Sequence, residues 1–109
     1  MNWHTITSES DWETILKSSE TIPQLVYKHS TRCSVSAVAK ARLERAETPE
    51  HVQFHYLDPI RYRQVSNRIA EDTGVHHESP QVLLIVNGKC VFNESHMAIN
   101  MDDIVAAIP

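Results

Sequence analysis

Glycine is scarce in this chain, with two residues among 109, and proline is limited to five. No segment is therefore rich enough in either residue to form a collagen-like repeat, a flexible linker or a low-complexity array. A phosphate-binding loop needs several closely spaced glycines, and the nucleophile elbow of a serine hydrolase needs the pattern Gly-x-Ser-x-Gly. Neither pattern occurs, which excludes a P-loop and argues against Ser-His-Asp catalysis.

Long hydrophobic runs and an excess of positive charge are also absent. The longest apolar run, Val82–Val86, is far shorter than a membrane span. Fourteen acidic residues against ten Lys and Arg give a net charge of −4, and the largest basic group (Arg61, Arg63 and Arg68) is small. Binding to nucleic acid depends on clustered cations that neutralise phosphates. We therefore expect neither a nucleic acid nor a membrane as a partner.

Cysteine is limited to two residues, Cys33 and Cys90. The first residues, Met1–His4, lack the basic and apolar regions of a secretory signal peptide, so we expect a cytoplasmic protein. In that reducing compartment the two cysteines are expected to be free thiols rather than a structural disulfide. The composition, with 41% hydrophobic and 22% charged residues, predicts one globular domain over residues 1–109.

Short apolar or alternating segments predict five strands. The apolar run Leu25–Tyr27 is typical of a buried strand, and the β-branched residues of Gln81–Val86 favour another. Asn87-Gly88 is a two-residue hairpin signal, so a partner strand should follow it directly. The predicted strands cover residues 3–7, 25–27, 52–57, 81–86 and 89–92.

Four helices are predicted from caps and apolar stripes. Ser10-Asp11-Trp12-Glu13 has the pattern of a capping box, which indicates a helix that begins at Ser10 and ends before Pro23. A second helix starts near Ser34 and ends by Thr48-Pro49. A third carries Tyr62, Val65 and Ile69 and ends at Gly74, a residue suited to a left-handed cap, and a fourth follows Asn100 with Asp103 at its third position.

The order of these elements is β-α-β-α-β-α-β-β-α. Strands separated by helices are expected to pair in parallel through right-handed crossovers, and the two strands of the hairpin must be antiparallel. The fold class is therefore α/β, with a mixed central sheet and helices on both faces.

Cys33 lies between a buried strand and an amphipathic helix. Open α/β sheets bind ligands at the carboxyl ends of their parallel strands, and the first amides of a helix carry partial positive charge. These amides, the adjacent Arg32 and a protonated His29 could lower the pKa of the thiol and make it nucleophilic. The alternative is a cysteine that packs as a small hydrophobic residue. Ser36 takes the place of the second cysteine of a Cys-x-x-Cys motif, so its hydroxyl could bond the thiolate but could not form a disulfide.

The element order, this Cys-x-x-Ser and the dipeptide Ser79-Pro80 before the fourth strand resemble a thioredoxin-like domain. More specifically, residues 28–36 (Lys-His-Ser-Thr-Arg-Cys-Ser-Val-Ser) resemble the active-site segment of the YtxJ family, the bacillithiol-system redox-active proteins or monothiol bacilliredoxins. Further matches are Met1-Asn2-Trp3, Asn87-Gly88, Ser95-His96 and Ile99, so the resemblance covers nearly the whole chain. The chain departs from the family at Ser34, where a proline usually follows the cysteine.

The resemblance implies a thiol-disulfide oxidoreductase whose nucleophile, Cys33, removes a low-molecular-weight thiol such as bacillithiol from S-thiolated client proteins. That thiol would be a co-substrate, with no bound cofactor and no metal. The resemblance also implies that Pro80 is preceded by a cis peptide bond and lies against Cys33. The residues expected to contact the thiol or substrate are Thr31, Arg32, Ser34, Ser36, Ser79 and Pro80, supported by His29 and His77.

Two other functions are compatible with the residues. The same fold could be a binding module that holds a peptide beside Pro80 while Cys33 stays inert. A Cys33 dimer could instead carry a cluster or a metal ion, although the Cys-Gly-Phe-Ser signature of monothiol glutaredoxins is missing. The neighbouring His76, His77 and Glu78 could at most form an adventitious metal site with Cys33. Cys90 is expected to pack in the hairpin rather than to resolve a disulfide.

Overall fold

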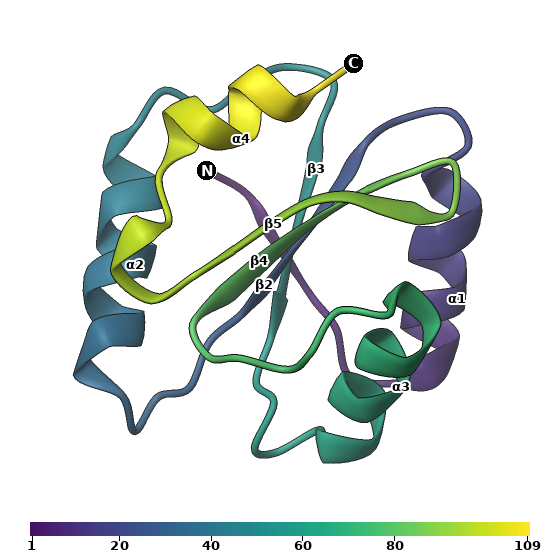
Figure 1. Ribbon diagram of the computed structural model, residues 1–109, viewed down its shortest axis with the longest axis horizontal. Coiled ribbons are helices and arrows are strands. Elements are labelled where there is room, and N and C mark those ends of the chain that lie inside the picture. The colour runs from purple at the N-terminus through teal and green to yellow at the C-terminus, as the bar shows by residue number, and fades with distance from the viewer.

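The computed structural model describes residues 1–109, which form five strands, four α-helices and one short 3₁₀ helix (Figure 1). Their order confirms the predicted β-α-β-α-β-α-β-β-α. None of the α-helices is both long enough and apolar enough to span a lipid bilayer. The elements are β1 (Trp3–Thr5), α1 (Glu9–Ser18), β2 (Gln24–Lys28), α2 (Ser34–Arg45), β3 (Gln53–Leu57), α3 (Arg63–Thr73), β4 (Gln81–Val86), β5 (Lys89–Ser95), η1 (His96–Ala98) and α4 (Met101–Ala107).

One mixed sheet contains all five strands in the order β1-β3-β2-β4-β5. Strands β1, β3 and β2 are parallel, whereas β4 is antiparallel to β2 and β5 is antiparallel to β4. Lys28, at the end of β2, pairs with Leu57 at the end of β3 and with Gln81 at the start of β4. The β2–α2, β3–α3 and α3–β4 loops therefore meet at one edge of the sheet, the lower edge in Figure 1.

The direction of β4 differs from the prediction that strands separated by helices pair in parallel. Helix α3 has 11 residues, which advance the chain by roughly 16 Å away from the end of β3. The connection 74–80 is not helical and can span more than that distance, roughly 20 Å or more when extended. It returns the chain to the edge where α3 began, so β4 runs antiparallel to β2.

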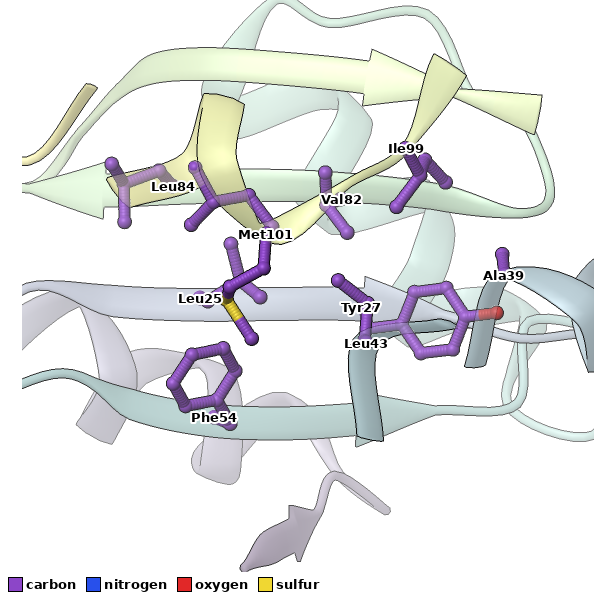
Figure 2. Close-up of a cluster of buried hydrophobic side chains, with 10 residues drawn as sticks. Leu25, Tyr27, Ala39, Leu43, Phe54, Val82, Leu84, Ile99 and Met101 are labelled. Carbon is purple, nitrogen blue, oxygen red and sulfur yellow. The ribbon is translucent and has the colours of Figure 1, made fainter. Parts of the chain in front are cut away.

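Both faces of the sheet are covered, with α2 and α4 on one side and α1 and α3 on the other (Figure 1). Side chains along a strand alternate between faces, so Leu25 and Tyr27 of β2 pack under α2 and α4, while Val26 packs under α1 and α3. Figure 2 shows the first core, where Leu43 and Met101 lie over the sheet. The second core contains Ile6, Trp12, Ile15, Val26, Leu57, Val65, Ile69, Leu83 and Ile85.

The predicted cap of the first helix is wrong by two residues. Ser8, not Ser10, is the N-cap, and its hydroxyl accepts the backbone N–H of Asp11 at 3.1 Å. The Asp11 carboxylate accepts the N–H of Thr7, the residue before the cap, at 2.9 Å, so this helix N-terminus lies two residues before the predicted one. Accordingly β1 ends at Thr5, earlier than predicted. Strand β5 continues to residue 95 rather than 92, because its pairing with β4 extends beyond the apolar segment.

Candidate functional site

The edge of the sheet where three loops meet brings the predicted site residues together. Cys33 lies in the β2–α2 loop, and the Ser79–Pro80 dipeptide lies directly before β4, which pairs with β2. Cys33 and Ser79 line a common cavity of about 220 Å³. The thiol is partly exposed, so a second sulfur can reach it from solvent.

Cys33 is the N-cap residue of α2. Its backbone carbonyl accepts the N–H groups of Ser36 at 3.1 Å and Ala37 at 3.4 Å, so the first turn of the helix begins directly after it. The backbone N–H of Ser36 lowers the pKa of the Cys33 thiol most, with further contributions from the N–H of Val35 and the Ser36 hydroxyl, while partial desolvation opposes them. A helix N-terminus stabilises the thiolate in this way because its first amides carry partial positive charge.

Ser36 is fully buried and connects the loop to the sulfur. Its hydroxyl oxygen accepts the backbone N–H of Ser30 at 3.3 Å, which leaves the hydroxyl proton free to be donated to the Cys33 thiolate. The Ser36 carbonyl accepts the hydroxyl of Tyr27 at 2.8 Å, so the first turn of α2 is fixed to the central strand.

The other residues of the loop differ in exposure. Thr31, Arg32 and Ser34 are exposed. His29 is buried, and its Nδ1 bonds the Tyr27 hydroxyl at 3.2 Å. Burial lowers the pKa of His29, with a smaller contribution from Lys40. The groups that lower the pKa of Cys33 are the backbone amides of the first helical turn and the Ser36 hydroxyl, and Arg32 and His29 are not among them.

The Ser79–Pro80 peptide bond is cis, as the family resemblance implied. Pro80 is buried, and its carbonyl accepts the N–H of His96 at 2.9 Å. The Ser79 hydroxyl is buried and has no hydrogen-bond partner, the one such side-chain atom in the chain. An unpaired buried hydroxyl is unfavourable, and a ligand in the adjoining cavity could satisfy it.

His77 reaches the same cavity from the α3–β4 loop. Its Nδ1 lies 3.2 Å from Lys28 Nζ and 3.2 Å from the Ser66 hydroxyl. Burial lowers the pKa of His77, and the charge of Lys28 lowers it further. Lys28 is fully buried at the end of β2, which sequence reasoning did not single out. The available signal was a charged residue at an inward position of a strand, where an apolar residue is expected.

Cys90 lies far from this edge. It lies on β5 and pairs with Ile85, near the end of β4. Cys33 instead follows the end of β2, which pairs with Gln81 at the start of β4. Its thiol donates to the carbonyl of Phe92 at 3.2 Å, it packs against the second core, and burial raises its pKa. No three His, Cys, Asp or Glu side chains are grouped so that they could hold a metal ion.

Removal of the Ser36 hydroxyl should slow the reaction of Cys33 with an alkylating agent. In Ser36→Ala the thiolate loses a hydrogen bond, so its pKa rises. We expect the alkylation rate at pH 7 to fall by about three- to tenfold, the equivalent of one hydrogen bond, while the plateau rate at high pH is unchanged. A rate-against-pH profile followed by mass spectrometry measures both. Ser10→Ala, an exposed serine of α1, is the matched control, and an unchanged profile for Ser36→Ala would contradict the role of the hydroxyl.

The fold of this chain is similar to that of several thioredoxins of known structure. The thioredoxins of Trypanosoma brucei brucei and Fasciola hepatica superpose with TM-scores of 0.77 and 0.75 at 16% identity each. Each comparison covers 96% of this chain, with 92% of the first and 95% of the second. At this identity the likeness establishes the fold alone, and it confirms the predicted thioredoxin-like architecture.

A nearer relative and a family model go further than the fold. A candidate oxidoreductase with a thioredoxin fold is 31% identical, with a TM-score of 0.83 over 94% of this chain and 90% of the other. The family model described as monothiol bacilliredoxin BrxC matches residues 4–104. Together with a cysteine of lowered pKa at the start of α2, these matches support a thiol oxidoreductase. The chain belongs to the monothiol bacilliredoxin family.

Proposed function

We propose that this protein removes a low-molecular-weight thiol, such as bacillithiol, from protein mixed disulfides through a nucleophilic Cys33. The observation that carries the proposal is a partly exposed thiol whose pKa is lowered by the amides and hydroxyl of the first helical turn. The family match supports the monothiol character, and the serine at position 36 leaves Cys33 without a neighbouring cysteine.

The exchange step conserves electrons. The Cys33 thiolate attacks the sulfur of the small thiol, the bond between that sulfur and the client sulfur breaks, and a new disulfide joins Cys33 to the small thiol. The client leaves as a thiolate and takes a proton from solvent at the cavity that His77 lines. A second molecule of the small thiol then attacks the sulfur of the small thiol that is bonded to Cys33. This step restores the Cys33 thiolate and releases the symmetrical disulfide of the small thiol.

Each residue expected at the site receives a role in this scheme. The amides of α2 and the Ser36 hydroxyl stabilise the thiolate of Cys33. The backbone groups beside the cis Ser79–Pro80 bond orient the incoming disulfide. The exposed side chains of Thr31, Arg32 and Ser34 contact the small thiol or the client, and the buried His29 holds the loop through Tyr27.

Regeneration depends on an external thiol rather than on a bound cofactor. Ser36 cannot form a disulfide, and Cys90 lies at the other end of β4. The cytoplasm of a cell that maintains free bacillithiol would supply this co-substrate. Its clients would be proteins whose cysteines have become S-thiolated.

The test uses a folded model protein with one cysteine carrying bacillithiol, compared with the same protein carrying glutathione. We expect the chain to accelerate release of bacillithiol over that caused by free bacillithiol alone, with turnover in excess of one client per molecule. Binding of the thiolated client without any release would favour an inert binding module. Faster release of glutathione than of bacillithiol would keep the reaction and change the co-substrate.

A further inference from the structure

The cavity beside Cys33 is polar, and no carboxylate lines it or forms an ion pair with its arginine. The groups that line it include Arg63 and Asn67 from the first turns of α3, together with His77 and Ser79. No aspartate or glutamate lines it, although the chain contains fourteen. The wall of this cavity therefore has no negative side chain, although the chain as a whole has a net charge of −4.

The acidic residues next to the cavity in sequence form their hydrogen bonds and ion pairs with groups outside its wall, although the charge of Glu78 also acts on His77. One oxygen of Asp58 accepts the N–H groups of Ile60 at 3.0 Å and Arg61 at 3.2 Å. Glu78 pairs with His96 at 3.2 Å. All ion pairs of the chain involve Lys40, Arg68 or His96, so Arg63 has no carboxylate within 4 Å.

Lys28 adds a second cation directly behind the wall. It is completely buried, and its Nζ contacts only the Ser66 carbonyl at 3.5 Å and the His77 Nδ1 at 3.2 Å. Ser66 and His77 both line the cavity. Burial lowers the pKa of Lys28 to about 8, so the amine is still mostly protonated at neutral pH. A buried ammonium without a counter-ion is unfavourable, and an apolar side chain of the same length would avoid that loss.

The orientation of the neighbouring donors also favours an anion. An ammonium group can only donate, so the Nδ1 of His77 accepts from Lys28 and the neutral ring carries its proton on Nε2. The Ser79 hydroxyl is buried without a partner. The Arg63 guanidinium and the Asn67 amide supply further N–H groups at the same cavity.

We propose that this cavity is an anion subsite that holds a carboxylate of the small thiol, next to the sulfur that Cys33 attacks. The inference rests on the proposed function and deepens it, since it names the chemical feature by which the small thiol is recognised. A volume of about 220 Å³ suits a carboxylate-bearing fragment bonded to a sulfur at Cys33, and is below the roughly 300 Å³ of the smaller drug-sized pockets. We assign the small thiol as the occupant because its sulfur is the atom that Cys33 attacks, which holds its carboxylate beside a cavity that Cys33 itself lines.

A matched pair of small disulfides tests this subsite. The 2-pyridyl disulfides of 3-mercaptopropionate and of 3-mercaptopropionamide have the same atoms around the sulfur and differ in the charge at the far end. Cys33 attacks the alkyl sulfur, forms the mixed disulfide with it, and releases pyridine-2-thione, which is followed by absorbance. Each rate is divided by the rate at which free 2-mercaptoethanol reacts with the same probe. This division removes the difference in intrinsic reactivity between the two probes.

We expect the wild type to prefer the carboxylate probe by about tenfold, the equivalent of about 1.4 kcal/mol. Lys28→Met and Arg63→Gln should each reduce that preference to about twofold or less and leave the rate with the amide probe within about twofold. Arg63 is exposed, so its variant keeps the test valid if Lys28→Met does not fold. Arg61→Gln, which removes a neighbouring cation that does not line this cavity, should keep the preference.

Each result that would contradict the subsite leads to a different conclusion. Equal rates for both probes with the wild type, or a preference that survives in Arg63→Gln and Lys28→Met, would refute the subsite while leaving the exchange reaction in place. Loss of the preference in Arg61→Gln would show a general field instead of a site. No reaction with either probe would refute the proposed function itself. A last comparison uses two client peptides whose cysteine carries 2-mercaptoethanol, one with glutamate and one with glutamine beside that cysteine. Faster reaction of the glutamate peptide would assign the cavity to the client.

Discussion

Cys33→Ser should abolish removal of the small thiol from a thiolated client, with a loss of rate of about a thousandfold or more. A serine hydroxyl is not ionised near neutral pH and cannot form a disulfide, so the covalent intermediate has no counterpart in the variant. Cys33 is partly exposed at the surface, and its backbone forms hydrogen bonds with Ser30, Ser36 and Ala37 that do not depend on the sulfur. The fold should therefore persist, and circular dichroism would confirm that the loss is chemical.

The matched control is Cys90→Ser. Its thiol is half-buried at the opposite end of β4, and burial raises its pKa, so it is a poor nucleophile at neutral pH. The rate of thiol release should stay within about twofold of wild type. If Cys33→Ser keeps a tenth of the wild-type rate, or if Cys90→Ser loses as much as Cys33→Ser, Cys33 is not the sole nucleophile.

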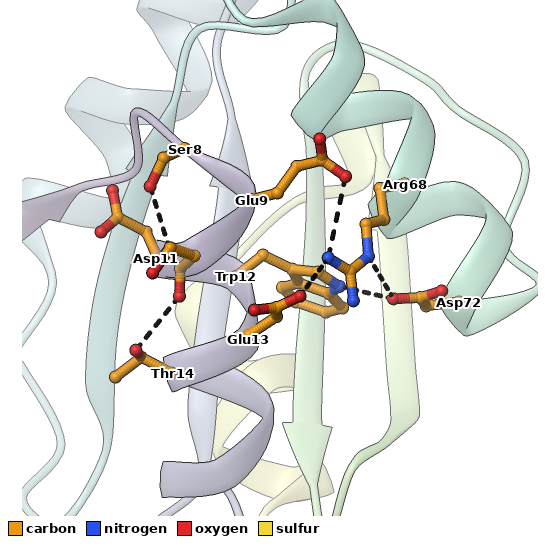
Figure 3. A network of polar contacts seen from close by, with 9 residues as sticks. Ser8, Glu9, Asp11, Trp12, Glu13, Thr14, Arg68 and Asp72 are labelled. Atoms are coloured by element: carbon orange, nitrogen blue, oxygen red, sulfur yellow. Dashed lines mark hydrogen bonds and ion pairs between the residues drawn. The ribbon is translucent and has the colours of Figure 1, made fainter.

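Trp12→Ala should give one of the largest losses of stability, about 3–5 kcal/mol in the free energy of unfolding. Trp12 is completely buried in the core between the sheet and α1 and α3. Its indole N–H donates to Asp72 of α3 at 2.9 Å, and Arg68 bonds that same carboxylate at 3.3 Å and Glu13 of α1 at 2.6 Å (Figure 3). The substitution leaves a large cavity and removes the buried link between the two helices. Urea unfolding followed by circular dichroism measures the change.

Two further variants separate packing from the hydrogen bond. Trp12→Phe keeps most of the ring and loses the indole N–H, so we expect a smaller loss of about 1–2 kcal/mol. Val105→Ala, at an exposed valine of α4, should change stability by less than about 0.5 kcal/mol. A loss below about 1 kcal/mol for Trp12→Ala would mean that α1 contributes little to the core.

The ends of the helices show what local sequence determines. Gly74 ends α3 with a φ of 72°, as its lack of a side chain predicts, and Asn100 accepts the N–H of Asp103 at 2.9 Å at the start of α4. The start of α1 was ambiguous, because Ser8 and Ser10 are each followed three residues later by an acidic residue. Tertiary contacts decide between them, since Glu13 pairs with Arg68 of α3 rather than with a cap.

The direction of β4 and the surroundings of Lys28, behind the cavity wall, could not be predicted from local sequence. The direction of β4 depends on whether the connection 74–80 spans the length of α3. The residue pattern of β4 itself contains no information on that distance. Cys33 and Ser36 could be predicted because a strand, a loop and a helix that are consecutive in the chain place them. Lys28, by contrast, acquires its surroundings from Ser66 and His77, which α3 and its following loop bring next to it.

The most direct test of the central claim is the mass of the protein after one turnover without free thiol. The reduced chain is mixed with an equal amount of a client that carries bacillithiol on one cysteine, the reaction is quenched with acid, and intact masses and peptides are measured. The account predicts that the client loses bacillithiol while Cys33 gains it in equal amount, with Cys90 unmodified. A client that keeps its bacillithiol while Cys33 stays free, or a disulfide between Cys33 and the client sulfur as the main product, would contradict it.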